Sequence, residues 1–199
     1  MNILVNKSFK TVLIFLGLAL LLPHHVAGQQ WSASIRPAIN FPVEDVSQTE
    51  LRVGNGLEFT AQYQLMPHIQ LFTGFSWHQF DTDEDFDAVN TDYALRGFIL
   101  GSRIKLPLNK SKLGYFVVVA ATLHRIDIEG GMPRLTIRSS FQPDLTFGAG
   151  VEIPTFSQLK IVPEVRYASF SEDFSNPQID DTIALRFVSL SVGIRYVFK

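Results

Sequence analysis

Apolar and polar residues alternate along most of the chain beyond residue 30. The segment 190–198 shows the pattern most clearly, with Leu, Val, Ile, Tyr and Phe at its even positions and Ser, Gly, Arg and Val between them. A period of two places the apolar side chains on one face of a β-strand. The alternation predicts eight strands, at residues 31–41, 57–65, 69–77, 98–106, 113–123, 145–153, 159–167 and 190–198.

The lengths of these segments and of their connections indicate a membrane barrel. Segments of nine to eleven residues match a tilted membrane-spanning strand, whereas strands of soluble proteins average about five or six residues. Short connections at 66–68, 107–112 and 154–158 alternate with long ones near 42–56, 80–93, 125–141 and 169–183. Short turns at one end and long loops at the other are typical of outer-membrane barrels, and an even strand count places both termini at the short-turn end.

The direction of the apolar face separates a membrane barrel from a soluble one. A soluble lipocalin-like barrel also has eight strands, but its apolar face points inward. Here the polar face carries charges of both signs and is rich in Gly and Ser, as a narrow lumen requires. Aromatic residues on the apolar face lie near the strand ends, where two membrane interfaces would be: Trp31, Tyr63, Tyr115 and Tyr196 at one end, and Phe41, Trp77 and Tyr167 at the other. We therefore expect an all-β, eight-stranded antiparallel up-and-down transmembrane barrel, with a soluble ligand-binding barrel as the alternative.

Two features leave the strand register open. Pro37 and Pro163 fall inside predicted strands, and each removes a ladder hydrogen bond, so we expect local bulges there or a ladder that starts late. The strand at 113–123 is apolar on both faces, so alternation alone does not define which of its faces points inward.

The N-terminal segment reads as a secretory signal peptide. Lys7 and Lys10 precede an apolar run at 11–22, and small residues surround a cleavage point after Gly28. A membrane anchor is the alternative, but a span needs roughly 20 apolar residues. We therefore expect residues 1–28 to direct export through the general secretory pathway and residues 29–199 to form the barrel domain.

Composition narrows the possible chemistry. The chain has 199 residues, 46% of them hydrophobic, a net charge of −2 and no cysteine. Without cysteine there is no disulfide framework, thiolate metal site, cysteine nucleophile or lipoprotein acylation site. The mild acidity argues against a nucleic-acid partner, and we expect no cofactor.

The last strand carries a family resemblance. It ends Gly193-Ile194-Arg195-Tyr196-Val197-Phe198 and is followed by Lys199; this amphipathic, aromatic ending resembles the assembly signal of bacterial outer-membrane proteins, with the usual terminal Phe displaced by one place. Residues 29–199 as a whole resemble the small outer-membrane β-barrels of the OmpA-like and OmpX-like type. The resemblance implies an outer-membrane location, contact with outer-membrane lipid and insertion by the barrel-assembly machinery, and we expect a monomer.

Charged residues on the polar face form the first candidate site. Unpaired charges are too costly inside a narrow lumen, so these residues should pair across strands. Arg36–Glu58, Glu152–Lys160 and Glu164–Arg195 are plausible pairs. The structural interpretation is a polar plug, because eight strands leave room only for side chains; a gated conductance is the alternative. The expected lumen network comprises Arg36, Glu58, Arg103, Lys105, Glu152, Lys160, Glu164, Arg166 and Arg195.

An acidic connection is the second candidate site. Asp81, Asp83, Asp85 and Asp87 offer oxygen ligands suited to Ca²⁺ or another hard cation. The spacing lacks the Gly and the closing Glu of a calcium loop, so a solvated loop is the alternative. The connection at 169–183 adds further carboxylates, and an acidic rim suits cation-bridged lipid headgroups or a basic partner.

Catalysis is a competing function class. Some small outer-membrane barrels that resemble this chain modify lipids, and they need a His with a Ser or Asp in reach. His68, His78 and His124 follow the signal segment, and His78 lies near Ser76, but no complete constellation can be assembled. We therefore expect no enzyme, and a structural or adhesion-like surface role, with a small pore and a lipid-modifying enzyme as alternatives.

Overall fold

The structure is a computed structural model that describes residues 30–43, 51–81, 92–107, 113–130, 135–173 and 182–198. The predicted signal segment at 1–28 lies outside these residues. Within the described part of the chain, no helix is long and apolar enough to cross a membrane. All of the extended structure belongs to one antiparallel sheet.

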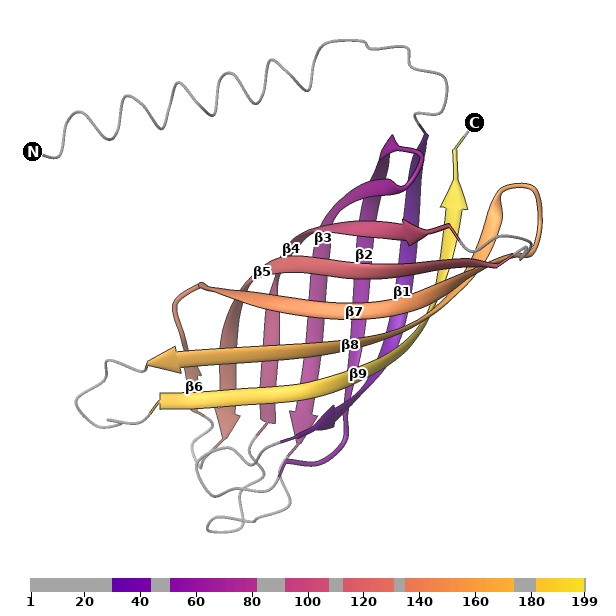
Figure 1. Ribbon diagram of the computed structural model, residues 1–199. Coiled ribbons are helices and arrows are strands. Elements are labelled where there is room, and N and C mark those ends of the chain that lie inside the picture. Colours follow the sequence, from indigo (N-terminus) through magenta and orange to yellow (C-terminus); the bar gives the residue numbers. More distant parts are fainter. Residues whose placement is uncertain are drawn as a thin grey trace, which may run out of the picture.

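The sheet closes into a barrel of eight strands (Figure 1). Neighbouring strands pair in the order β4-β3-β2-β1-β9-β8-β7-β5, and β4 also pairs with β5, which closes the ring. A ninth, short strand, β6, pairs with β5 alone. The predicted eight-stranded antiparallel barrel is therefore confirmed. The strands are β1 (Trp31–Pro42), β2 (Gly54–Met66), β3 (Ile69–Asp81), β4 (Asp92–Leu106), β5 (Gly114–Gly130), β6 (Leu135–Arg138), β7 (Gln142–Pro154), β8 (Leu159–Asp173) and β9 (Thr182–Val197).

The two ends of the barrel differ. At one end, which we call the turn end, Pro67 and His68 join β2 to β3, and a four-residue link at 155–158 joins β7 to β8. The first residue of β1 and the last residues of β9 lie at this same end (Figure 1). The strand ends that border the long connections, among them the ends of β3 and β8, lie at the opposite end, which we call the loop end.

Apolar side chains face outward along the wall of the barrel. Leu100 is 64% exposed, whereas Arg103 on the same strand is only 2% exposed, because its side chain points into the lumen. The alternative of a soluble barrel with an apolar interior is therefore wrong for this part of the wall. Trp31 and Tyr63 pack at 5.0 Å between ring centroids at the turn end. An exposed apolar belt bounded by aromatic residues is the surface that a bilayer covers.

The strands continue past this belt at the loop end, where the inside–outside pattern inverts. On β3 the outward residues after Trp77 are Gln79 and Asp81, while Phe80 between them points inward and is fully buried. The neighbouring strands change in the same way: Leu95 and Ile126 are buried, while Arg96 and Arg125 face outward. The strands predicted from alternation end before these extensions, because a barrel wall in water has polar residues outside and apolar residues inside, which is the reverse of a wall in lipid.

The inverted segments fill the lumen at the loop end with an apolar cluster, which we call the lumen cap. Phe187 is central to it, with its ring 5.1 Å from that of Phe80 and 5.5 Å from that of Phe170. The cap comprises Leu51, Phe80, Leu95, Ile126, Ala168, Phe170, Leu185 and Phe187. Burial of these side chains holds the extended strands together above the membrane.

The expected bulges at the prolines are wrong. The pairing of β1 with β9 skips Arg36 and Pro37 and resumes at Ala38 in an unchanged register. Pro163 behaves alike, since β8 loses its partners in β7 at Val162 and Pro163 without a shift. Each proline therefore interrupts a ladder on one side, because its nitrogen carries no hydrogen, but inserts no extra residue.

The register of β5 is also settled by the structure. Phe116 and Val118 are buried inside the lumen, while Val119 and Leu123 face outward. The even-numbered residues of this strand therefore form its inner face, even though both faces are apolar.

The cost of an outward-facing charge should depend on whether it lies within the apolar belt or beyond it. Leu100→Arg places a cation within the apolar belt and should lower the free energy of unfolding by about 2–4 kcal/mol. Ser171→Arg, on an exposed outward position of β8 beyond the belt, should change it by about 1 kcal/mol or less. Equilibrium unfolding by denaturant in lipid vesicles measures both values, and equal costs at the two positions would contradict the assigned faces.

Candidate functional site

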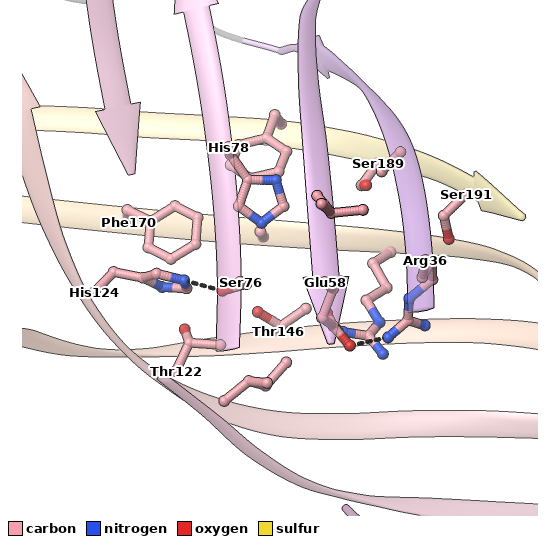
Figure 2. Close-up of a pocket in the computed structure, with 16 residues that line it drawn as sticks. Arg36, Glu58, Ser76, His78, Thr122, His124, Thr146, Phe170, Ser189 and Ser191 are labelled. Carbon is pink, nitrogen blue, oxygen red and sulfur yellow. Dashed lines mark hydrogen bonds and ion pairs between the residues drawn. The ribbon is translucent and has the colours of Figure 1, made fainter. Parts of the chain in front are cut away.

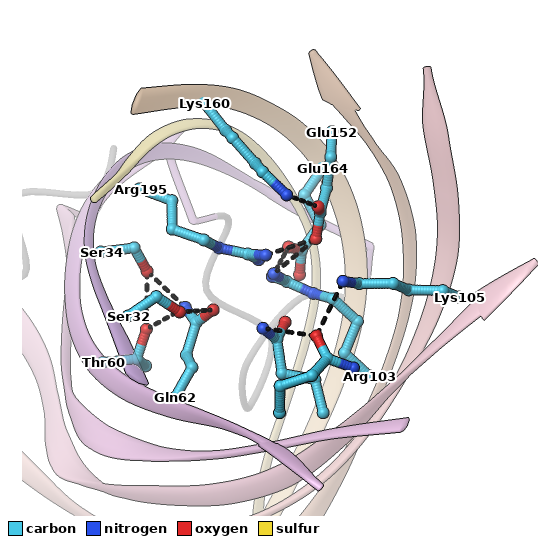
Figure 3. Close-up of polar contacts among 12 residues, drawn as sticks. Ser32, Ser34, Thr60, Gln62, Arg103, Lys105, Glu152, Lys160, Glu164 and Arg195 are labelled. Carbon is cyan, nitrogen blue, oxygen red and sulfur yellow. Dashed lines mark hydrogen bonds and ion pairs between the residues drawn. The ribbon is translucent and has the colours of Figure 1, made fainter. Parts of the chain in front are cut away.

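The nine predicted lumen charges all lie on inward-facing positions. The guanidinium groups of Arg36, Arg103, Arg166 and Arg195 are buried, as are the carboxylates of the three Glu residues. Lys105 and Lys160 lie near the turn end and are partly exposed. We call the nine residues the ion-pair network, and Figure 3 shows part of it across the lumen.

Glu164 on β8 is the centre of the network. Its carboxylate accepts contacts from Arg36 and Arg166, and Arg103 Nη2 lies 3.1 Å from Glu164 Oε2. These cations come from β1, β8 and β4, so the contacts span the lumen rather than follow one ladder. A fully buried carboxylate with three cationic partners has its desolvation offset by charge-assisted hydrogen bonds.

Glu58 forms a second centre near the first. Its carboxylate pairs with Arg36, directly opposite on β1, which confirms the predicted Arg36–Glu58 pair. Arg166 Nη1 reaches the other oxygen of Glu58 across the lumen at 2.8 Å. Glu58 and Glu164 are therefore linked twice, through Arg36 and through Arg166.

Glu152 serves the turn-end side of the network. Lys160 Nζ lies 2.9 Å from its carboxylate, which confirms the predicted Glu152–Lys160 pair, and Arg103 Nη1 lies 3.7 Å away. Arg195 also pairs with Glu152, so the predicted Glu164–Arg195 pair is wrong. The reason is register, since Arg195 lies opposite Lys160 in the β8–β9 ladder, four residues from Glu164.

One wall of the lumen is apolar where the network crosses it. The guanidinium of Arg103 lies 4.1 Å above the Phe116 ring, and that of Arg166 lies 5.5 Å from the Phe72 ring. Gly101 leaves room for one of these rings, because a Cβ there would lie 2.5 Å from Phe72 Cζ. Cation–π contacts of this kind supplement the ion pairs in a desolvated site.

The turn end of the lumen is filled by uncharged polar groups. Gln62 Nε2 donates to Ser34 Oγ at 2.8 Å, and Ser34 lies 2.7 Å from Thr60 Oγ1. Lys105 Nζ donates to Gln64 Oε1 at 2.8 Å. Figure 3 shows this cluster beside the charged residues. The polar plug predicted for a narrow barrel therefore extends from the network to the turn end.

A small cavity separates the network from the lumen cap (Figure 2). Its volume is about 30 Å³, and its lining combines hydroxyl groups and two imidazole rings with apolar side chains such as Ile99 and Phe170. Ser76 Oγ lies 2.6 Å from His124 Nε2, while His78 Nδ1 lies 3.1 Å from Asn40 Nδ2. Sequence reasoning placed Ser76 near His78; the partnership with His124 was missed because it joins strands 48 residues apart.

The acidic connection falls mostly outside the described residues. Asp81 ends β3 and is exposed, while Asp83, Asp85 and Asp87 lie in the connection that follows and are not described. Within the described ranges, no cluster of three or more potential ligands could hold a metal ion. The cation site proposed from the sequence therefore stays a prediction.

Comparison with known proteins gives structural matches only. No family model and no curated protein matches the sequence. The Neisserial surface protein A structure matches with a TM-score of 0.63 and 15% identity, over 86% of this chain and 98% of that one. Escherichia coli outer membrane protein W matches with a TM-score of 0.56 and 13% identity, over 87% of this chain and 100% of that one. A third match is Ail, the attachment invasion locus protein of Yersinia pestis, in complex with the heparin analogue sucrose octasulfate. Its TM-score is 0.51 and its identity 12%, over 85% of this chain and 97% of that one.

This chain has the fold of the small bacterial outer-membrane β-barrels. The resemblance noted in its sequence is thereby confirmed at the level of fold, and the exposed apolar belt of the barrel has the character of a wall in contact with lipid. In barrels of this class, short turns face the periplasm and long loops face the exterior. The ion-pair network lies at the level of the apolar belt, and the lumen cap lies at the loop end.

The network predicts a strong dependence on its central carboxylate. Glu164→Gln removes one charge from a buried group with three cationic partners and should lower the free energy of unfolding by about 3–5 kcal/mol. Lys160→Gln is the matched control, because Lys160 is 30% exposed and its loss should cost about 1 kcal/mol or less. Urea unfolding of both variants in the same lipid tests this, and a Glu164 variant no less stable than the Lys160 variant would refute the central role.

Proposed function

We propose that the barrel is a closed anchor in the outer membrane, and that it works through the surface it presents outside the cell. The observation that carries this proposal is the filling of the lumen at three successive levels. Polar side chains fill the turn end, the ion-pair network crosses the middle, and the lumen cap closes the loop end. With the interior occupied, the outer surface is the part left to meet other molecules.

The chemistry of the filling disfavours a pore, which is the second candidate function. The rings of Phe80, Phe170 and Phe187 form a dry constriction, and an ion that enters such a constriction loses its hydration. Below the cap, an ion would also have to displace the contacts of Glu164, which span the lumen. Both barriers would have to open together for conduction.

A conductance measurement tests this closure. Purified protein inserted into planar lipid bilayers should give no unit current steps, because neither the cap nor the network leaves a continuous aqueous path. A heat-induced shift in mobility on gels is the control that folded barrel was present. Reproducible steps from folded protein would favour the pore instead.

The outer surface points to a basic partner. The sequence places carboxylates in the connections at the loop end, among them Asp81, Asp83, Asp85 and Asp87. Such a rim attracts cationic groups and repels polyanions. The sulfated ligand in the Ail complex is therefore a poor model for the partner of this chain. Binding of Ca²⁺ by the same four carboxylates is a second use that would compete with a basic partner.

Adhesion of whole cells tests the partner chemistry. Cells that display the chain should bind a surface coated with basic polypeptide several-fold better than cells displaying a variant with Asn at positions 81, 83, 85 and 87. Neither strain should gain binding to immobilised heparin. The difference should shrink as salt rises, since screening weakens exposed charge contacts. Loop-independent binding, or binding to heparin, would argue against a basic partner.

We also propose that the chain is not an enzyme. Ser76 and His124 form a hydrogen-bonded pair, but both are buried beneath the lumen cap. His124 Nδ1 has no hydrogen-bond partner within the described residues, so no carboxylate orients the ring. The lipid A of cells that produce the chain should therefore have the same masses as that of cells without it.

Export, assembly and oligomeric state complete the proposal. The segment 1–28 would direct the chain through the general secretory pathway, and β9 with Phe198 would present it to the barrel-assembly machinery. The ring closes within one chain, since β1 pairs with both β2 and β9. This supports a monomer, because the fold needs no strand from a second copy.

A further inference from the structure

The buried charges of the lumen do not balance. Four arginines, Arg36, Arg103, Arg166 and Arg195, are buried in the network. Only three buried carboxylates face them, those of Glu58, Glu152 and Glu164. The two lysines nearer the turn end add positive charge rather than compensate it. Each guanidinium contacts at least one carboxylate, but the buried part of the network carries one positive charge in excess, and an uncompensated charge in that environment is costly.

The hydrogen-bond pattern shows the same deficit of acceptors. Five buried guanidinium nitrogens have no hydrogen-bond partner within the described residues: Arg103 Nε and Nη1, Arg166 Nη2, and Arg195 Nε and Nη2. Arg103 Nη1 has an ion-pair contact with Glu152 at 3.7 Å, which is too long for a hydrogen bond. Buried donors in native structures find acceptors, so these groups indicate a missing acceptor.

The cavity below the lumen cap supplies a place for an acceptor beside one of these donors, Arg166 Nη2, because Arg166 lines the cavity whereas Arg103 and Arg195 do not. Arg36 and Arg166 contribute to its network side, and the rest of the lining mixes hydroxyl groups with imidazole and apolar side chains, such as His78 and Phe170 (Figure 2). Glu58 also lines it, but its two oxygens are already engaged by Arg36 and Arg166. Five hydroxyl groups line it. Ser191 Oγ donates to Glu164 O at 3.1 Å, Thr122 Oγ1 donates to Asp144 O at 3.5 Å, and Ser76 Oγ pairs with His124 Nε2. The hydroxyl groups of Thr146 and Ser189 remain as donors to a bound group.

We propose that this cavity binds one small monovalent anion, of the size of chloride or bromide, against Arg166 Nη2. One negative charge balances four arginines against three glutamates. A volume of about 30 Å³ admits a single small ion or roughly two water molecules. Guanidinium and hydroxyl donors are suited to a spherical anion, whereas water would fill the space but leave the charge uncompensated.

Bromide locates the site directly because it scatters anomalously. Crystals of the detergent-solubilised protein grown in sodium bromide should show an anomalous peak in the cavity, within contact distance of Arg166 Nη2. A cavity that holds only water density, or a bromide peak confined to other positions, would overturn the proposal.

A pair of charge variants tests the balance without touching the cavity lining. Arg103→Gln leaves three buried arginines against three glutamates, so it should weaken chloride binding and raise the half-saturating chloride concentration at least tenfold. Glu152→Gln leaves four buried arginines against two glutamates, so it should strengthen chloride binding and lower the half-saturating concentration by a similar factor. The readout is the rise in unfolding midpoint when chloride replaces gluconate, an anion too large for the cavity, at constant ionic strength. Damage to the network alone would weaken the chloride effect in both variants, and that result would overturn the proposal. If either variant fails to fold, the bromide experiment on the unmodified protein still decides the question.

Discussion

A strand surrounded by hydrocarbon must pair along both edges, because lipid offers no partner to a free peptide N–H or C=O group. The ladders β1–β9 and β4–β5 meet this requirement by closing the sheet on itself. β6 is paired on one side only, and it lies beyond Arg125, where the wall has left the apolar belt and water can hydrate its edge. The bilayer thus fixes which parts of the chain must belong to the ring and which can branch from it.

Closure at eight strands also fixes a narrow interior, and the choice of lumen residues follows from that. Gly101 accommodates the Phe72 ring, where any larger residue would collide. The long charged side chains cross the remaining space and meet on Glu164. Because these charged groups are removed from water, an ion pair between them stabilises the barrel only where nearly all of its polar atoms have partners. The surplus of guanidinium donors is the exception, and one of these donors, Arg166 Nη2, belongs to a residue that lines the cavity we describe in the lumen.

The polarity of the wall changes where the barrel leaves the membrane. Within the belt, Leu100 and its neighbours face lipid, and Arg103 faces the lumen. Beyond Trp77 the interior becomes apolar at Phe80, and the exterior becomes polar at Gln79. One continuous sheet therefore has an apolar outer face within the belt, as in a membrane barrel, and a polar outer face with an apolar interior at the loop end, as in a soluble protein. This change closes the lumen from outside and leaves the surface beyond the belt as the place for contacts with other molecules.

The sequence by itself determined the eight strands of the ring, the two faces of all of them but β5, and the pair Arg36–Glu58, because alternation is a local property and these two residues are neighbours across one hairpin. It did not reveal the extension beyond Trp77, because the alternation there has the opposite sense. The contacts of Arg103 with Glu164 and of His124 with Ser76 were also beyond it. These residues lie on strands far apart in the chain, and only the stagger of the closed ring decides which of them meet at the same level of the lumen.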